Sequence, residues 1–133
     1  MGSETYDRSL TYLYDLQKYG IKFGLSSTSN LLARLGNPHK NLRAIHIAGT
    51  NGKGSTAAML SAILARAGMQ VGLYTSPHLV KFNERFRINE KDVDDRLIMD
   101  VFRRVRDVVD EREPPTIFEM TTAMALSLFA EKR

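Results

Sequence analysis

Residues 43–56, RAIHIAGTNGKGST, are the most informative stretch of this chain. The apolar run 43–48 is typical of a short buried strand, and it leads directly into a loop with three glycines. Residues 57–67 are strong helix formers, and Gly68 marks the end of that helix. Residues 71–75 predict a second short strand. A strand, a glycine loop, a helix and a strand within about thirty residues predict one βαβ unit, whose strands pair in parallel.

The glycine loop of this unit is suited to binding phosphate. Backbone N–H groups of such a loop, and the N-terminus of the helix after it, point toward an anion. Lys53 would add a positive charge for the β and γ phosphates, and Ser55 or Thr56 a hydroxyl for Mg²⁺. The usual P-loop pattern is broken twice, because Gly54 follows the lysine and Ile47 stands at the first glycine position. A glycine-rich turn that binds nothing therefore remains the alternative.

The segments before the loop predict two helices. Residues 4–19 have apolar residues at helical spacing, and Gly20 ends that helix. Residues 21–25 are interpreted as a loop. A hydroxyl of Ser26-Ser27-Thr28 can then cap a short helix that runs to Leu35 and stops at Gly36-Asn37-Pro38.

The segments after the loop predict a long connection and two more helices. Residues 76–92 are polar and are interpreted as an irregular loop, a kind that is often functional. Helical spacing predicts an amphipathic helix over 97–109, closed by Pro114-Pro115. A last helix, from Ile117 to about Ala130, is apolar nearly all round and should be buried. Thr116 and Glu119 precede its apolar run at capping-box spacing.

The composition is that of an ordinary globular domain, with 133 residues, 43% of them hydrophobic and 26% charged. No stretch approaches the roughly 18 apolar residues that a membrane span needs. The polar N-terminus is not a signal peptide, so the cytoplasm is the expected location. The chain has no cysteine, which excludes disulfides and thiolate metal sites.

The charge pattern argues against a nucleic-acid partner. The net charge is only +4, and basic and acidic residues alternate over 100–111, as on a solvated helix face. An anionic small molecule suits this charge equally well. Of the histidines, His46 is expected in the core, His78 in the long loop, and His39 facing solvent.

Four blocks of the sequence resemble one enzyme family. They are Gly49–Ser55, Thr75–Leu79, Phe82–Asn89 and Thr116–Glu119. In this order and at similar spacings they resemble the folate branch of the Mur ligase superfamily, the dihydrofolate and folylpolyglutamate synthases, over about residues 20 to 133. The resemblance implies an α/β fold, a P-loop NTPase-like parallel sheet with flanking helices (the Mur ligase central ATPase domain), incomplete in this chain. Residues 1–133 would be its N-terminal portion, with the remaining sheet and the C-terminal glutamate-binding domain absent.

The resemblance also implies roles for individual residues. Lys53 would be the catalytic cation. The ATP-binding residues would be Thr50, Asn51, Gly52, Lys53, Gly54, Ser55 and Thr56. Ser76 would bind Mg²⁺, although a turn hydroxyl before Pro77 is the alternative. The residues contacting pterin or folate would be Lys22, Phe23, Gly24, Leu25, Arg85, Thr116, Ile117, Phe118 and Glu119.

Two of these assignments leave a purely structural reading open. Lys22–Leu25 could be an ordinary turn between helices. Arg85 could belong to a surface pairing, Glu84–Arg85 or Arg87–Glu90, instead of meeting a substrate carboxylate.

The implied activity is ATP-dependent addition of L-glutamate to dihydropteroate or a folate through an acyl phosphate. Its cofactors would be ATP and Mg²⁺, its partners these small molecules without nucleic acid or membrane, and the full-length enzyme a monomer. The isolated fragment is expected to be inactive and to expose an unpaired sheet edge. Another P-loop enzyme, such as a nucleotide kinase, and a non-catalytic nucleotide-binding module are the alternatives.

Overall fold

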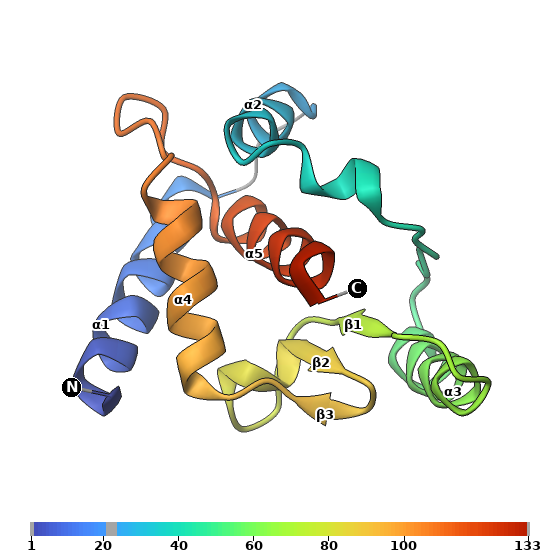
Figure 1. The fold of residues 1–133 in the computed structure, drawn as a ribbon. Coiled ribbons are helices and arrows are strands. Elements are labelled where there is room, and N and C mark those ends of the chain that lie inside the picture. Colours follow the sequence, from blue (N-terminus) through green and yellow to red (C-terminus); the bar gives the residue numbers. More distant parts are fainter. Residues whose placement is uncertain (1, 21–23, 133) are drawn as a thin grey trace. The chain divides into compact units, whose positions relative to one another are not determined.

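A computed structural model describes residues 2–20 and 24–132 (Figure 1). The chain forms two compact units, one of Met1–Leu42 with Asp95–Lys132 and the other of Arg43–Asp94. The first unit is helical. Its α-helices are α1 (Gly2–Asp15), α2 (Ser26–Arg34), α4 (Asp95–Arg106) and α5 (Ile117–Lys132), and its short 3₁₀ helices are η1 (Leu16–Tyr19) and η2 (Pro38–Asn41).

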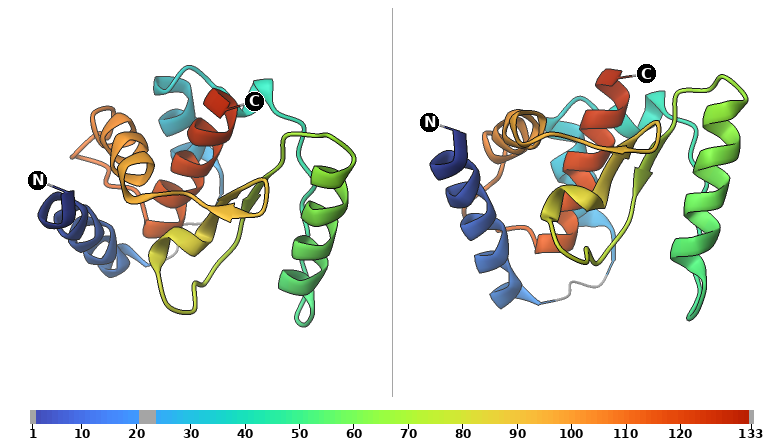
Figure 2. Two further views of the ribbon diagram at one scale, coloured as in Figure 1. Left: turned by 60° about the horizontal axis from the view of Figure 1, so that its bottom comes forward. Right: turned by 90° about the horizontal axis from the view of Figure 1, so that it is seen from below.

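The helical unit is built around α5, which contacts α1, α2, η2 and α4. Figure 1 and both views of Figure 2 show α5 beside α2. The predicted burial of this helix is confirmed, because its fully buried side chains include Met120, Met124 and Leu128. Phe118, in its first turn, is the exception at 63% exposure. Burying a side chain of this size stabilises the fold by about 1.5–3 kcal/mol, so the apolar run of α5 organises the unit.

The amphipathic helix α4 contributes the facing stripe of Ile98, Val101, Phe102 and Val105, all buried. Its basic residues face solvent, and Arg104 pairs with Glu131 at 2.6 Å between half-exposed side chains. The ring of Phe102 meets that of Tyr12 edge-on at 5.5 Å, which packs α4 against α1. The prediction of a solvated face on this helix is confirmed.

The ends of α2 confirm one prediction and correct another. The helix stops as predicted: Gly36 and Asn37 have φ of 84° and 53°, and the Asn37 N–H donates to the Leu32 carbonyl at 2.8 Å. Its N-cap is Leu25, with no side-chain capping bond, so the predicted hydroxyl cap is wrong. His39 corrects a further expectation, because it is half-buried and its Nδ1 atom is buried without a hydrogen-bond partner.

The second unit combines one α-helix and a short 3₁₀ helix with a small sheet. Its elements are α3 (Lys53–Arg66), β1 (Gly72–Tyr74), η3 (Phe82–Arg85), β2 (Phe86–Ile88) and β3 (Lys91–Asp92). The strands lie in the order β1-β2-β3, and both pairs are antiparallel. Leu73 lies opposite Arg87, and Ile88 opposite Lys91.

The predicted strand at 43–48 is wrong for this structure. Among the described residues these six form neither strand nor helix, and Ile45 is 66% exposed. A strand needs a neighbour to accept and donate its backbone hydrogen bonds, and the only strand predicted beside it, β1, pairs with β2 instead. His46 is consequently exposed instead of lying in a core. The α/β class is confirmed, but the described sheet is antiparallel.

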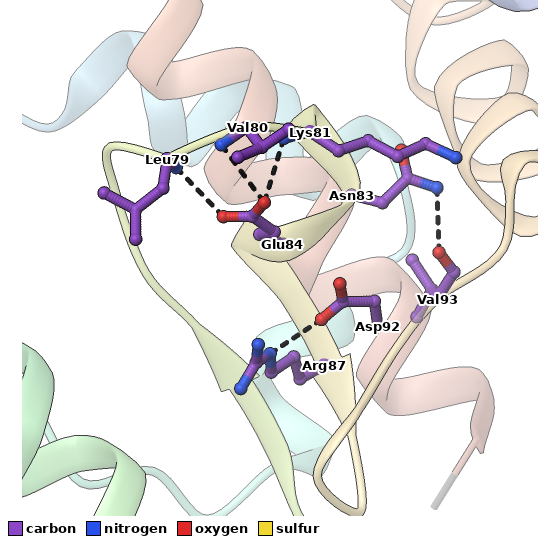
Figure 3. A network of polar contacts seen from close by, with 8 residues as sticks. All are labelled: Leu79, Val80, Lys81, Asn83, Glu84, Arg87, Asp92 and Val93. Atoms are coloured by element: carbon purple, nitrogen blue, oxygen red, sulfur yellow. Dashed lines mark hydrogen bonds and ion pairs between the residues drawn. The ribbon is translucent and has the colours of Figure 1, made fainter.

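The predicted irregular loop at 76–92 is also corrected, because it contains η3 and a hairpin. Phe82 and Phe86 are buried and anchor it. Asn89 and Glu90 have φ of 51° and 71°, which is the two-residue turn that joins tightly paired strands. The Arg87 side chain pairs with Asp92 at 2.7 Å across this hairpin (Figure 3). Arg87 therefore pairs with Asp92 instead of Glu90, the partner suggested by the sequence.

No helix within residues 2–20 and 24–132 is both long and apolar enough to span a bilayer.

Candidate functional site

The glycine loop leads straight into a helix N-terminus. Helix α3 begins at Lys53, four residues before the predicted start at Ala57, and Gly52 is its N-cap. Gly52 has φ of 75°, a conformation that favours glycine because a Cβ atom would strain it. The first helical bond runs from the Thr56 N–H to the Gly52 carbonyl at 2.9 Å. The N–H groups of Lys53, Gly54 and Ser55 precede it and are the ones that a helix leaves without an internal acceptor.

This end of α3 has the chemistry of an anion site. Residues 50–56 are all exposed, so their backbone and hydroxyl groups are accessible. The helix dipole places partial positive charge at this end, and the Lys53 side chain begins in the same turn. The predicted ATP-binding residues thus lie together, in one loop and the first turn of α3.

Ser76 follows β1, and it is exposed. The peptide bond between Ser76 and Pro77 is cis. The Thr75 N–H donates to the Arg85 carbonyl at 3.0 Å, which ties the end of β1 to η3. The strand β1 also contacts α3. Ser76, after β1, and Lys53, at the start of α3, belong to the same unit.

The described residues offer few metal ligands. No three His, Asp or Glu side chains within them are placed to hold an ion together. Mg²⁺ in nucleotide sites, however, keeps several waters and takes only one or two protein ligands beside the phosphates. An exposed hydroxyl such as that of Ser55, Thr56 or Ser76 fits this donor set.

The carboxylate of Glu84 organises the segment after Ser76. It accepts the backbone N–H groups of Leu79, Val80 and Lys81 at 2.9, 3.1 and 2.9 Å (Figure 3). The bonds from Lys81 and Leu79, and a weaker one from Val80, hold the pKa of Glu84 below its usual range. Nearby, Asn83 is buried, and its amide donates to the Val93 carbonyl at 2.8 Å. The segment is therefore an ordered loop closed by its own polar contacts.

Arg85 is held by His78. Its Nε–H donates to His78 Nδ1 at 2.9 Å, and its guanidinium lies 5.4 Å from the centre of the Phe82 ring. Burial, and then the charge of Arg85, lower the pKa of His78, while Glu84 acts in the opposite direction. Accepting this bond requires an unprotonated Nδ1, which agrees with the lowered pKa. Arg85 is thus oriented through His78, not through the considered pair with Glu84.

The block 116–119 forms the predicted capping box at the start of α5. The Glu119 N–H donates to Thr116 Oγ1 at 3.1 Å, and the Thr116 N–H donates to Glu119 Oε1 at 3.0 Å. Both side chains are buried. Ile117 is half-buried, whereas Phe118 is exposed and could present its ring to a flat ligand.

The other predicted pterin block, 22–25, is only partly described. Lys22 and Phe23 lie outside the described residues. Gly24 has φ of 85°, and Leu25 is 76% exposed at the start of α2. Glu119 Oε2 accepts the Thr28 hydroxyl at 3.0 Å, so this end of α2 is bonded to the capping box.

The structure therefore groups the predicted residues in two sets. The glycine loop, Ser76 and Arg85 belong to the unit 43–94. Gly24, Leu25 and the block 116–119 belong to the helical unit. Sequence reasoning missed the structuring roles of Glu84 and Thr28. Glu84 lies three residues after Lys81 at the start of a short helix, a capping-box position that could have been noticed, whereas the partner of Thr28 is 91 residues away.

Comparison with known proteins identifies the relatives of the chain. No family model matches it. It is 40% identical over 131 residues to a dihydrofolate synthase/folylpolyglutamate synthase of Bacillus subtilis, covering 95% of this chain and 30% of that protein. A folylpolyglutamate synthase structure from Thermotoga maritima superposes with a TM-score of 0.90 and 42% identity, covering 99% of this chain and 32% of that one. A bifunctional folylpolyglutamate synthase/dihydrofolate synthase from Yersinia pestis, complexed with AMPPNP and Mn ion, gives 0.88 and 34%, over 100% and 32%.

By fold and site the chain is an α/β protein with a glycine-rich loop at a helix N-terminus. It belongs to the dihydrofolate synthase/folylpolyglutamate synthase family, and it spans about a third of the length of these relatives. The resemblance drawn from the four sequence blocks is confirmed.

Proposed function

We propose that this chain is the ATP-binding portion of a ligase that adds L-glutamate to dihydropteroate or a folate. One observation carries the proposal: the glycine loop ends at Gly52 in a left-handed conformation, and Lys53 opens α3 directly after it. The relative from Yersinia pestis, which is complexed with AMPPNP and Mn ion, supports a nucleotide and a divalent metal as ligands of this family.

The first turn of α3 would hold the phosphates of ATP. The N–H groups of Lys53, Gly54 and Ser55 would donate to phosphate oxygens, and the Lys53 ammonium would offset the charge that develops on the transferring group. Bound Mg²⁺ would supply further charge neutralisation, with hydroxyls from Ser55 or Thr56 and from Ser76 as its protein ligands. Catalysis here is positioning and electrostatics, for which no protein nucleophile is required.

The reaction would join a carboxylate to an amine. A carboxylate is a poor electrophile, so transfer of the γ-phosphoryl group of ATP to it makes an acyl phosphate and releases ADP. Attack by the amine of L-glutamate then forms the amide and releases phosphate. Arg85 is suited to bind a substrate carboxylate, because His78 fixes its Nε and thereby the plane of the guanidinium.

The acceptor would contact the helical unit through Leu25 and Phe118, which are exposed apolar side chains. Lys22 and Phe23 are proposed for the same role from the sequence, with Thr116, Ile117 and Glu119 forming the wall behind Phe118. A pterin ring stacks favourably on an aromatic side chain, which supports Phe118 as the main contact.

The remaining parts of the proposal concern the whole protein. Residues 1–133 would be the N-terminal portion of a Mur ligase-type ATPase domain. In the whole enzyme, residues 43–48 would become a strand of a parallel sheet once a neighbouring strand supplies hydrogen-bond partners. The proposed enzyme is a cytoplasmic monomer that binds neither nucleic acid nor membrane, and residues 1–133 alone would not ligate glutamate.

A chimera tests the proposal. The chain is joined to the remaining two thirds of the Thermotoga maritima relative, and ATP-dependent attachment of labelled glutamate to dihydropteroate and to tetrahydrofolate is measured. The chimera should turn over at the scale of typical enzymes, roughly 1–1000 s⁻¹, while the remainder alone should not. A folded chimera that binds ATP without ligating glutamate would favour the non-catalytic nucleotide-binding module.

A further inference from the structure

We propose that Thr28 is a positioning residue, which couples the start of α2 to the first turn of α5 and so fixes the separation of Leu25 and Phe118. The inference rests on the proposed function, in that these two side chains are the described apolar contacts for the pterin.

The Thr28 side chain, in α2, is hydrogen-bonded to α5. Its hydroxyl donates to Glu119 Oε2 at 3.0 Å, across 91 residues of sequence. Thr28 lies in the first turn of α2, whose N-cap, Leu25, makes no side-chain capping bond. The hydroxyl is instead bonded to the neighbouring helix.

The acceptor of this bond is held rigidly. Glu119 is 6% exposed, and its other oxygen accepts the Thr116 N–H at 3.0 Å. The Glu119 N–H is in turn bonded to Thr116 Oγ1. A buried glutamate that is bonded through one carboxylate oxygen and through its backbone N–H holds its other carboxylate oxygen in place. That oxygen then sets the position of the group that donates to it.

Both apolar contacts are close in sequence to this bond. Phe118 directly precedes Glu119, and Leu25 lies three residues before Thr28, with its carbonyl accepting the Ser29 N–H at 2.8 Å. The helices α2 and α5 are also in contact, and Leu31 and Leu32 of α2 are buried. Apolar contacts tolerate small sliding movements, whereas a directed hydrogen bond to a charged group fixes the register of the two helices.

The substitution Thr28→Val removes the hydroxyl at nearly constant shape, and Thr28→Ser keeps it. The dissociation constant for 7,8-dihydropteroate is measured on the full chain by calorimetry, with that for MgATP as the internal control. Thr28→Val should weaken dihydropteroate binding about 5- to 30-fold, which is less than the full loss of one bond to a charged group because Thr28 acts on the ligand indirectly. Thr28→Ser should restore it to within about twofold, and MgATP binding should change in neither variant.

A second measurement decides the coupling independently of the ligand. In ¹⁵N–¹H spectra, Glu119→Gln should shift the amide signals of Gly24 and Leu25, and Thr28→Val should shift that of Phe118. Unchanged signals, or equal dihydropteroate binding by the valine and serine variants, would overturn the role of Thr28. Failure of the unsubstituted chain to bind dihydropteroate would contradict the proposed acceptor and with it the positioning of a pterin, whereas a failed chimera with intact dihydropteroate binding would contradict only the ligase assignment.

Discussion

Replacing Glu119 by alanine should destabilise the helical unit strongly. Glu119 is 6% exposed, and its carboxylate accepts hydrogen bonds from the Thr116 N–H and from the Thr28 hydroxyl. Alanine leaves both donors without this acceptor, and Thr116 is itself only 3% exposed. Hydrogen bonds to a charged group contribute about 1.5–3 kcal/mol each, and relief of the buried charge offsets part of the loss.

The expected net change in the free energy of unfolding is about 2–4 kcal/mol. For a chain of this size that corresponds to a fall in Tm of roughly 8–15 °C. Urea unfolding followed by far-ultraviolet circular dichroism measures the first quantity, and a thermal scan the second.

A matched control lies in the same helix. Glu131 is also a glutamate of α5 with a basic partner, but its side chain is 50% exposed, so Glu131→Ala should cost less than about 1 kcal/mol. Glu119→Gln keeps the size and one carbonyl acceptor, and should fall between the two. If Glu119→Ala and Glu131→Ala cost the same within error, the capping box does not stabilise this helix as argued.

Three further predictions concern Ser76, Phe118 and Glu84. In the chimera, Ser76→Ala should raise the Mg²⁺ concentration needed for half-maximal activity more than it raises the KM for ATP; a change in Tm alone would identify a turn hydroxyl. Phe118→Ala should weaken dihydropteroate binding about 5- to 10-fold, as for loss of one stacked ring, with little change in Tm because the ring is 63% exposed; unchanged affinity would exclude stacking. Glu84→Gln should lower Tm at neutral pH, because a depressed pKa gives stability above the ordinary value of 4.5 that is lost as the pH falls through the folded pKa; a difference from the unsubstituted chain that persists at about pH 2 would refute the carboxylate's role.

The sequence was informative wherever local chemistry decides the structure. The capping box needs only Thr116 and Glu119 at the right spacing, and both of its bonds form. The end of α2 needs only residues that tolerate a left-handed backbone, which Gly36 and Asn37 provide. The burial of α5 follows from its apolar sequence.

The sequence was misleading where pairing decides the structure. Residues 43–48 have the composition of a strand, but a strand forms only beside a partner, and none of the described segments pairs with them. The hairpin of β2 and β3 was missed because the strands have only three and two residues, too few to show an alternating pattern. Its turn depends on Asn89 and Glu90, of which only the first is a common turn residue.

In the candidate site, too, local motifs were predictable from the sequence and tertiary contacts were not. The phosphate loop was predictable as a local motif, and the start of α3 at Lys53 strengthens it by placing the lysine in the first turn. The contacts that orient the other residues, Arg85 with His78 and Glu119 with Thr28, depend on tertiary packing and have no signature in one sequence.

The affinity of this chain for MgATP, with and without Lys53→Ala, is the decisive test of nucleotide binding by the glycine loop. Lys53 is exposed, so its substitution should alter the free energy of unfolding by less than about 0.5 kcal/mol. Losing a charged contact to phosphate should raise the Kd by about 10- to 150-fold. Calorimetric titration of both proteins, with equal unfolding curves as the control, gives the answer. Saturable MgATP binding that depends on Lys53 in this way is the predicted result, and equal affinity of the two folded proteins would contradict the assignment of the glycine loop.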